Sequence, residues 1–294
     1  MSENTSTTAP SHTPLLDQLR SLLRAHRPAF KQERTFLRAQ ALALGHLFCF
    51  ARRTITQSLL SLGLTDSDWS AFYRLFSSKE RIDYETLSAT FLEQTLPLFG
   101  PADPYTAIVD GVQIPRHSTK MAGTSWLRNP MSPAFMPGIL RYQRFSHLAC
   151  LPPPSGEGYS RALPIRFEPA FPKKAIEAEG FSPKKEWEAA LDSIEWLRGR
   201  LDATQEEEEE ERGGRDLLVV GDGSYCVADL IEKLPEERVT LKGRVAPRTG
   251  RFTSCPRGGI TQAGSTASGH QRPRGGCAGG RASSTKSSRS GAGR

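Results

Sequence analysis

The sequence predicts an α/β protein in which a helical N-terminal region precedes a mixed β-sheet and a disordered C-terminal tail. Three observations lead to this class. Apolar side chains recur at helical spacing through residues 14–99. After a proline-punctuated linker, short β-branched runs alternate with helical patterns. From Gly243 onward the composition changes to Gly, Ser and Arg. A chain of 294 residues is long enough for one large domain or two ordinary ones.

The helical region is expected to cover residues 14–100, after a polar and disordered leader at 1–13. Leucines form a helical stripe from Leu15 to Leu23. A second helix is expected at 32–62, where apolar residues lie nearly all round and imply burial on more than one side. Two further helices are expected, one from near Trp69 and one from Tyr84 to Leu96.

The sheet region is expected at 105–242. Residues 116–137 are rich in Gly, Pro and polar side chains, which predicts a long loop. Helices are expected at 183–201 and around 226–234. The expected strands are 105–109, 144–151, 161–167, 217–220 and 239–241.

Two of these strands each deliver a carboxylate at or near the carboxyl end, Asp110 and Asp222. Ligands bind at that edge of open α/β sheets. If the two strands are neighbours, a divalent cation relieves the repulsion between the carboxylates, and Mg²⁺ or Mn²⁺ prefers such oxygen ligands. Each Asp is followed by Gly, however, and a strand that ends in Asp-Gly is also a common turn signal.

The tail, residues 243–294, contains nine Arg, one Lys and no acidic residue, so it carries +10. The whole chain carries +7, which leaves −3 for residues 1–242. Such a tail cannot bury enough apolar surface to fold, and it can bind polyanions non-specifically. The five cysteines form no CxxC pair, and their odd number fits free thiols in a reducing compartment.

Several separated stretches resemble one family, the insertion-sequence transposases of bacteria with a DDE, ribonuclease H-like catalytic domain. YTAIVDGVQIPRHSTKMAGTSWLRNP resembles their first-aspartate region, and LLVVGDGSYCVADLIEKLPE resembles their second. HRPAFKQERTFLRAQALALG and RRTITQSLLSLGLTDSDWSAFYRLFSS are similar to their N-terminal helices. FSHLACL and YSRALPIRFEPAF are similar to the intervening strands, so the resemblance covers roughly residues 14–241.

The resemblance implies a cut-and-paste DNA transposase in which three acidic residues hold two Mg²⁺ ions. It also implies that residues 105–242 form a partial ribonuclease H-like domain. Asp110 and Asp222 match the first two acids, although Gly111 stands where the family has a second acid. The third acid would be a Glu on a later helix, but no acidic residue follows Glu237, and Glu232 lies too close to Asp222.

DNA is the partner that the resemblance implies, in the form of transposon ends, together with intact transposase. Arg116 and Lys120 follow the first Asp and can meet a phosphate. Arg52 and Arg53 precede a short helix that could serve in a helix-turn-helix-like arrangement. A DNA contact of Trp126 is a further hypothesis. The chain shows no transmembrane run or secretory signal, and the resemblance implies a bacterial cytoplasmic, nucleoid-associated location.

The abrupt change of composition after Leu241 suggests a shifted reading frame. Off-frame codons in GC-rich DNA give Arg, Gly, Ala, Ser and Pro. Written as TTT-ACG-AGC-TGC-CCC, the codons of residues 252–256 read Tyr-Glu-Leu-Pro from two bases later, and the same shift further back permits Asn-Arg-Ala-Leu ahead of it. NRALYELP resembles the stretch that follows this strand in the family. The chain is thus expected to be a truncated, inactive transposase remnant.

Two other functions stay open at this stage. One is a DNA-binding module without catalysis, which would use the helical region and the basic tail. The other is a different Mg²⁺-dependent phosphoesterase that uses the two Asp residues on small phosphate esters.

The gene itself tests the frameshift. We expect one of the alternative frames to continue the domain past codon 242 and to encode the missing Glu on a helix. Sequencing the next few hundred bases checks this, and the hypothesis fails if neither alternative frame continues the domain.

Overall fold

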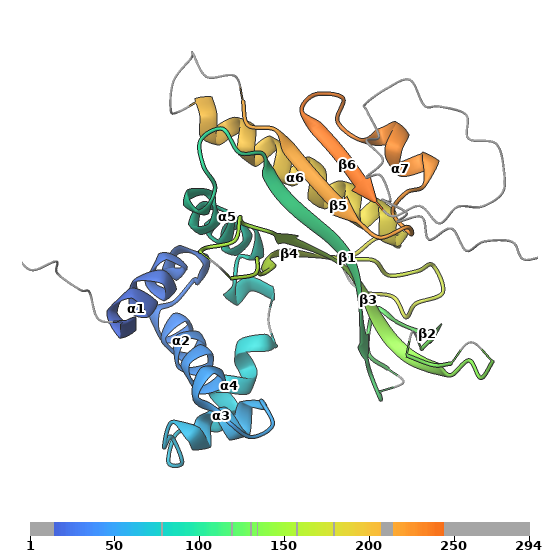
Figure 1. Cartoon of the computed structure of the whole chain (residues 1–294). Helices are drawn as coiled ribbons and strands as arrows, with labels where there is room; N and C mark the ends of the chain where they lie inside the picture. Colours follow the sequence, from blue (N-terminus) through green and yellow to red (C-terminus); the bar gives the residue numbers. More distant parts are fainter. Residues whose placement is uncertain are drawn as a thin grey trace, which may run out of the picture. The chain divides into compact units, whose positions relative to one another are not determined.

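The computed structural model describes residues 15–243, except 78, 119, 130, 134, 157, 179 and 207–213 (Figure 1). These residues fall within one compact unit, Met1–Ile260. Helices precede a mixed sheet, so the α/β class that the sequence predicts is confirmed. The predicted leader lies outside the described residues. The predicted tail does so as well except for Gly243, which is the last residue of strand β6 (Val239–Gly243).

Short helices make up the first part of the chain. In order they are α1 (Leu15–Ala25), η1 (Arg27–Ala29), α2 (Glu33–Phe48), α3 (Ile55–Ser61), α4 (Trp69–Tyr73), η2 (Arg74–Phe76), η3 (Lys79–Arg81), α5 (Tyr84–Thr95) and η4 (Leu96–Leu98). Elements α2, α3, α4 and η2 share a core that contains Phe36, Leu42, Leu59, Phe72 and Leu75, all of them buried.

The single helix expected at 32–62 is wrong, because the chain breaks between α2 and α3. Cys49 has an extended backbone, and the Thr54 side chain accepts a hydrogen bond from Gln57 N at 3.2 Å, so Thr54 caps a new helix. The break lets α3 fold back on α2. A Cβ at Gly45 would lie 2.8 Å from Ser58, so glycine permits this close approach.

Six strands form one sheet in the order β2-β3-β1-β5-β6, with β4 also paired to β3. The β1–β5 and β5–β6 pairs are parallel, and the pairs that involve β3 are antiparallel. The sheet region contains β1 (Tyr105–Pro115), β2 (Thr124–Arg128), β3 (Ile139–Cys150), β4 (Leu163–Pro169), α6 (Glu186–Glu206), β5 (Leu217–Gly221), α7 (Ala228–Lys233) and β6 (Val239–Gly243).

Strands β1 and β3 are longer than the sequence predicts. The expectation that β1 ends at 109 is wrong, since residues 110–115 continue to pair with β3. The loop expected at 116–137 contains strand β2, which pairs with residues 139–143 of β3. Cross-strand pairing thus extends the sheet through residues that are too polar and too rich in Gly and Pro to show a strand pattern. Helix α6 begins at Glu186, three residues later than expected.

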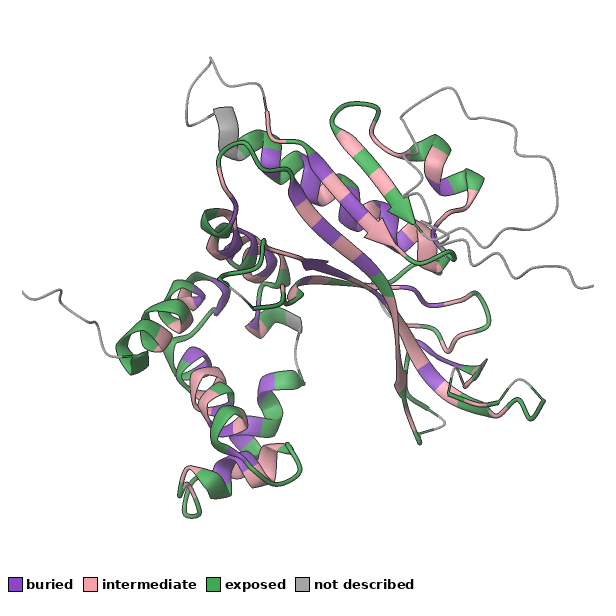
Figure 2. Cartoon of the chain, viewed as in Figure 1, coloured by how far each residue is buried: buried purple, intermediate pink, exposed green. Residues whose placement is uncertain are grey.

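One face of the sheet packs against α6. The buried side chains of Ala107 and Val109 in β1 and of Val219 in β5 belong to one apolar core with Ile194 and Leu197 of α6. Along β1, residues 105, 107 and 109 are buried and residues 106 and 108 are half-buried, so odd-numbered side chains point toward α6. Figure 2 shows this alternation as purple and pink bands.

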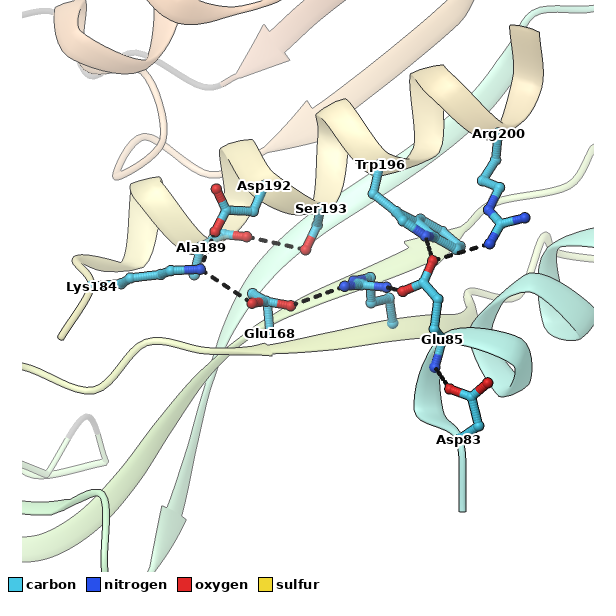
Figure 3. A network of polar contacts seen from close by, with 10 residues as sticks. Asp83, Glu85, Glu168, Lys184, Ala189, Asp192, Ser193, Trp196 and Arg200 are labelled. Carbon is cyan, nitrogen blue, oxygen red and sulfur yellow. Dashed lines mark hydrogen bonds and ion pairs between the residues drawn. The ribbon is translucent and has the colours of Figure 1, made fainter. Parts of the chain in front are cut away.

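A network around Glu85 ties α5 to the sheet region (Figure 3). Its carboxylate accepts a hydrogen bond from Arg166 Nη1 of β4 at 2.6 Å and hydrogen bonds from Trp196 and Arg200 of α6. Burial alone would raise the pKa of Glu85, but these three donors outweigh it and hold the pKa below its usual value. The ionised carboxylate is therefore the form that the fold stabilises.

Replacing Glu85 with Gln is expected to lower the free energy of unfolding at neutral pH by about 1 kcal/mol, because the charge-assisted bonds to a partly exposed group are lost. Since the folded pKa of Glu85 is lowered, its contribution is full above the unfolded value near 4.5 and is lost as the pH falls through the folded value. Urea unfolding from pH 7 to pH 3 measures both effects.

Glu93→Gln is the matched control, because Glu93 is exposed on the same helix. Its unfolding free energy should stay within about 0.5 kcal/mol of wild type. Equal losses in both variants would contradict the role assigned to the network.

Candidate active site

The two predicted aspartates lie on neighbouring parallel strands. The last paired residues of β1 and β5 are Val109 and Gly221, so Asp110 and Asp222 are the next residue on each strand. Asp222 follows the end of β5 as the sequence predicts. Asp110 instead lies inside β1, at the point where β5 ends and β1 continues beside β3. Within the described residues, β1 therefore has no partner strand on its β5 side at Asp110.

Backbone N–H groups hold both carboxylates. Gly111 N donates to Asp110 Oδ1 at 2.8 Å, and Ser224 N donates to Asp222 Oδ1 at 2.9 Å. The Ser224 hydroxyl adds a second hydrogen bond to Asp222 Oδ1 at 2.5 Å. Both side chains are exposed. In each carboxylate the second oxygen accepts no hydrogen bond from the described residues, so it can face a ligand.

This pair suits a hard divalent cation, because ionised carboxylate oxygens are the ligands that Mg²⁺ and Mn²⁺ prefer. Asp110 and Asp222 are the residues that would hold such an ion. Within the described part of the chain, no group of three or more His, Cys, Asp or Glu residues is arranged to bind a metal. The donor set therefore fits a divalent cation but supplies only two of its protein ligands.

A third carboxylate, Glu186, lies close to β1 on the α6 side of the sheet. A Cβ built on Gly111 would lie 2.0 Å from Glu186 Oε1, so the carboxylate fills the space that a side chain at position 111 would take. Glu186 forms an ion pair with Arg144 of β3 and accepts a hydrogen bond from the Tyr225 hydroxyl at 2.8 Å. A side chain at position 111 would therefore have to displace the Glu186 carboxylate, which gives a physical reason for a small residue beside Asp110.

Burial shapes the titration of the groups around the aspartates. It raises the pKa of the Tyr225 phenol, and the nearby Glu186 and Asp110 charges act in the same direction, so Tyr225 stays a neutral donor. His147 is the cross-strand partner of Asp110. Burial lowers the pKa of His147, and the Asp110 charge only partly opposes this. Asp110 thus has neutral aromatic side chains near it.

The predicted DNA-contacting residues lie in two places. Arg116 follows β1 directly, and its Nε donates to Gln143 Oε1 of β3 at 2.9 Å. Lys120 is exposed in the connection between β1 and β2. Arg52 and Arg53 are exposed in the loop between α2 and α3, and they do not lie on the sheet that carries the aspartates.

Sequence reasoning missed Glu186, Arg144 and Tyr225 as neighbours of the site. They come from α6, β3 and the turn after β5, so their sequence separations carry no motif. The one available signal was Gly111, which departs from the family pattern directly after Asp110.

Paired carboxylates on adjacent strands of an α/β sheet, followed by an acid-free basic segment, are the kind of arrangement that suits divalent-metal chemistry on a phosphodiester. The chain belongs to the DDE superfamily endonucleases, whose family model matches residues 23–289. This family acts on DNA and generally uses divalent metals. No curated protein gives a significant match to the chain.

The family match runs past residue 243 into the segment for which composition predicts a shifted frame. The frameshift therefore stays a prediction that the gene sequence decides. None of the helices in the described part of the chain combines the length and apolarity needed to span a bilayer.

Gly111→Ala is expected to lower the free energy of unfolding by about 1–3 kcal/mol, because the new methyl group displaces a carboxylate that Arg144 and Tyr225 hold in place. Chemical denaturation followed by circular dichroism measures the change.

Gly199→Ala is the matched control. A Cβ at this α6 position meets no atom within 4 Å, so alanine should stabilise the helix by up to about 1 kcal/mol. If Gly111→Ala is as stable as wild type, Glu186 does not pack on Gly111 as described.

Proposed function

We propose that the chain derives from a DDE-type DNA transposase whose first two catalytic carboxylates are Asp110 and Asp222. The observation that carries this proposal is the parallel register of β1 and β5, which makes the two aspartates neighbours on the sheet. Membership of the DDE superfamily endonucleases supports DNA as the substrate. Transposon ends are the DNA that the proposal implies.

In this proposal Asp110 and Asp222 hold Mg²⁺ or Mn²⁺ through the oxygens that accept no backbone hydrogen bond. A divalent cation held there would polarise the phosphate and activate the attacking hydroxyl group for DNA cleavage. The chain's own contribution is placement. Gly111 N and Ser224 N fix the two carboxylates, and the tie between Glu186 and Arg144 keeps α6 close to β1 at Gly111. Arg116 directly follows β1, and its guanidinium group would bind a DNA phosphate.

We further propose that this chain cleaves and transfers DNA poorly or not at all. The described residues bring no third carboxylate together with Asp110 and Asp222, and the sequence contains no acidic residue after Glu237. Glu186 does not serve as a replacement, because Arg144 and Tyr225 already engage its carboxylate on the α6 side of the sheet. A shifted reading frame after Leu241 accounts for the missing acid.

A second function, DNA binding without catalysis, has its own support. Residues 111–156 contain five Lys or Arg and no Asp or Glu, and they follow Asp110 directly. A chain that keeps this surface and lacks the third carboxylate can occupy transposon ends and interfere with intact transposase.

Manganese binding tests the assigned metal ligands independently of catalysis. We expect the full chain to bind Mn²⁺, measured by electron paramagnetic resonance, and expect Asp110→Ala and Asp222→Ala each to weaken binding at least tenfold, because each removes one of two charged ligands. Asp229→Ala, an exposed aspartate on α7, should bind like wild type. Unchanged binding in all three variants would refute the assigned ligands.

In the same preparation, cleavage and strand transfer on terminal-repeat DNA with Mg²⁺ or Mn²⁺ should be at background. A metal-dependent cleavage that Asp110→Ala abolishes would overturn the proposed inactivity and leave the assignment of Asp110 intact.

A further inference from the structure

The distal halves of β1 and β3, together with β2, form a ribbon whose character differs from that of the rest of the sheet. We call residues 111–116, 124–128 and 139–144 the cationic ribbon. They lie in a stretch, residues 111–156, that contains five Lys or Arg and no acidic residue. The rest of residues 1–242 is acidic overall, so positive charge is concentrated here.

Strand register puts the polar side chains of the ribbon on the face that carries Asp110. Asp110 pairs with His147, and β3 residues at steps of two from 147 share its face. Arg141 is one of these residues, and it pairs directly with Trp126 of β2. Arg128 lies two residues beyond Trp126 and pairs with Ile139, so it belongs to the same face. Arg144 faces the other way, toward Glu186.

Large apolar side chains near the tip of the ribbon are exposed. Trp126 is 63% exposed and Ile139 is 64% exposed. Met131, Phe135 and Met136, in the connection between β2 and β3, are exposed as well. Figure 2 shows the distal ends of these strands largely in green and pink. Apolar side chains rimmed by cations, on a ribbon free of acids, mark a binding surface.

Trp126 is held in place as it faces solvent. The Arg141 guanidinium lies 5.3 Å from the centre of the Trp126 ring, and Arg141 Nη1 donates to Thr124 Oγ1 at 3.0 Å. Arg141 thus braces the ring from its cross-strand position. A braced and exposed aromatic ring loses little conformational freedom on contact with a flat partner.

We propose that the cationic ribbon binds duplex DNA beside the scissile phosphate. Arg116 and Arg128 of the ribbon, and Lys120 in the adjoining connection between β1 and β2, would contact phosphates, and Trp126 would contact a base or sugar. Beyond Pro115, where β1 ends, the ribbon consists of β2 and β3 alone. A two-stranded β-ribbon fits the major groove, and the charge of the ribbon matches a phosphate backbone. Arg141 lies six residues from His147 along β3, which at about 3.3 Å per residue places the Trp126 pair roughly 20 Å from Asp110, about half a helical turn of DNA.

This inference rests on the proposed function in two respects, the choice of DNA as the substrate and the position of the scissile phosphate at Asp110 and Asp222. Its test therefore avoids catalysis. The full chain is titrated in EDTA with a random-sequence duplex of roughly two helical turns, and tryptophan fluorescence is recorded. Of the four tryptophans, all of which are described, only Trp126 is exposed. We expect the duplex to quench part of the wild-type fluorescence and expect Trp126→Phe to lose that quenching.

Salt dependence tests the cations. The plot of log affinity against log salt should become shallower by about 1 in Arg128→Ala, because one phosphate contact is lost. Arg161→Ala is the matched control, since Arg161 is exposed in the connection between β3 and β4, outside the ribbon. The basic tail is present in every variant, so its contribution cancels in the comparison.

The inference is overturned if Trp126→Phe is quenched as strongly as wild type, or if Arg128→Ala and Arg161→Ala have the same salt slope. It is also overturned if Trp126 is quenched by raising the protein concentration without DNA, because the ribbon would then bind a second copy of the chain. Quenching without Mn²⁺ binding by Asp110 and Asp222 would contradict the proposed function and leave the ribbon as a DNA site.

Discussion

The parallel pairing of β1 with β5 is the constraint on which the rest of the site depends. It joins strands that are more than one hundred residues apart in the chain, and it aligns Val109 with Gly221 so that the two aspartates follow side by side. Because β5 ends there and β1 does not, Asp110 stands at the edge of an opening rather than within a fully paired sheet. Without this register the aspartates would be two unrelated Asp-Gly pairs.

The sheet has two faces with different tasks. The face toward α6 holds the apolar core, and Glu186, Arg144 and Tyr225 form a polar cluster near its end. The face of Asp110 carries the cationic ribbon. The two faces therefore differ in charge. On the α6 side Glu186 pairs with Arg144, whereas residues 111–144 place no acidic side chain on the opposite side. This separation favours a phosphate backbone on the face where cleavage chemistry would occur.

The helical region is stabilised by its own core, and Glu85 joins it to the sheet region. That carboxylate receives donors from β4 and α6, so α5 is held by the same two elements that pack on the core of the sheet. Arg52 and Arg53 lie in the helical region instead, so any contact that they make with DNA is separate from the ribbon.

The sequence by itself determined the class of fold, the order of strands and helices around both aspartates, and the identity of Asp110 and Asp222 as the candidate ligands. These features follow from local periodicity and from motifs within short stretches. Only the tertiary structure decided that β1 and β3 run on as a ribbon, that β2 exists within the expected loop, and that Glu186 fills the space beside Gly111. The physical reason is that cross-strand hydrogen bonds and contacts between distant side chains stabilise these features, and neither leaves a periodic signal in the local sequence.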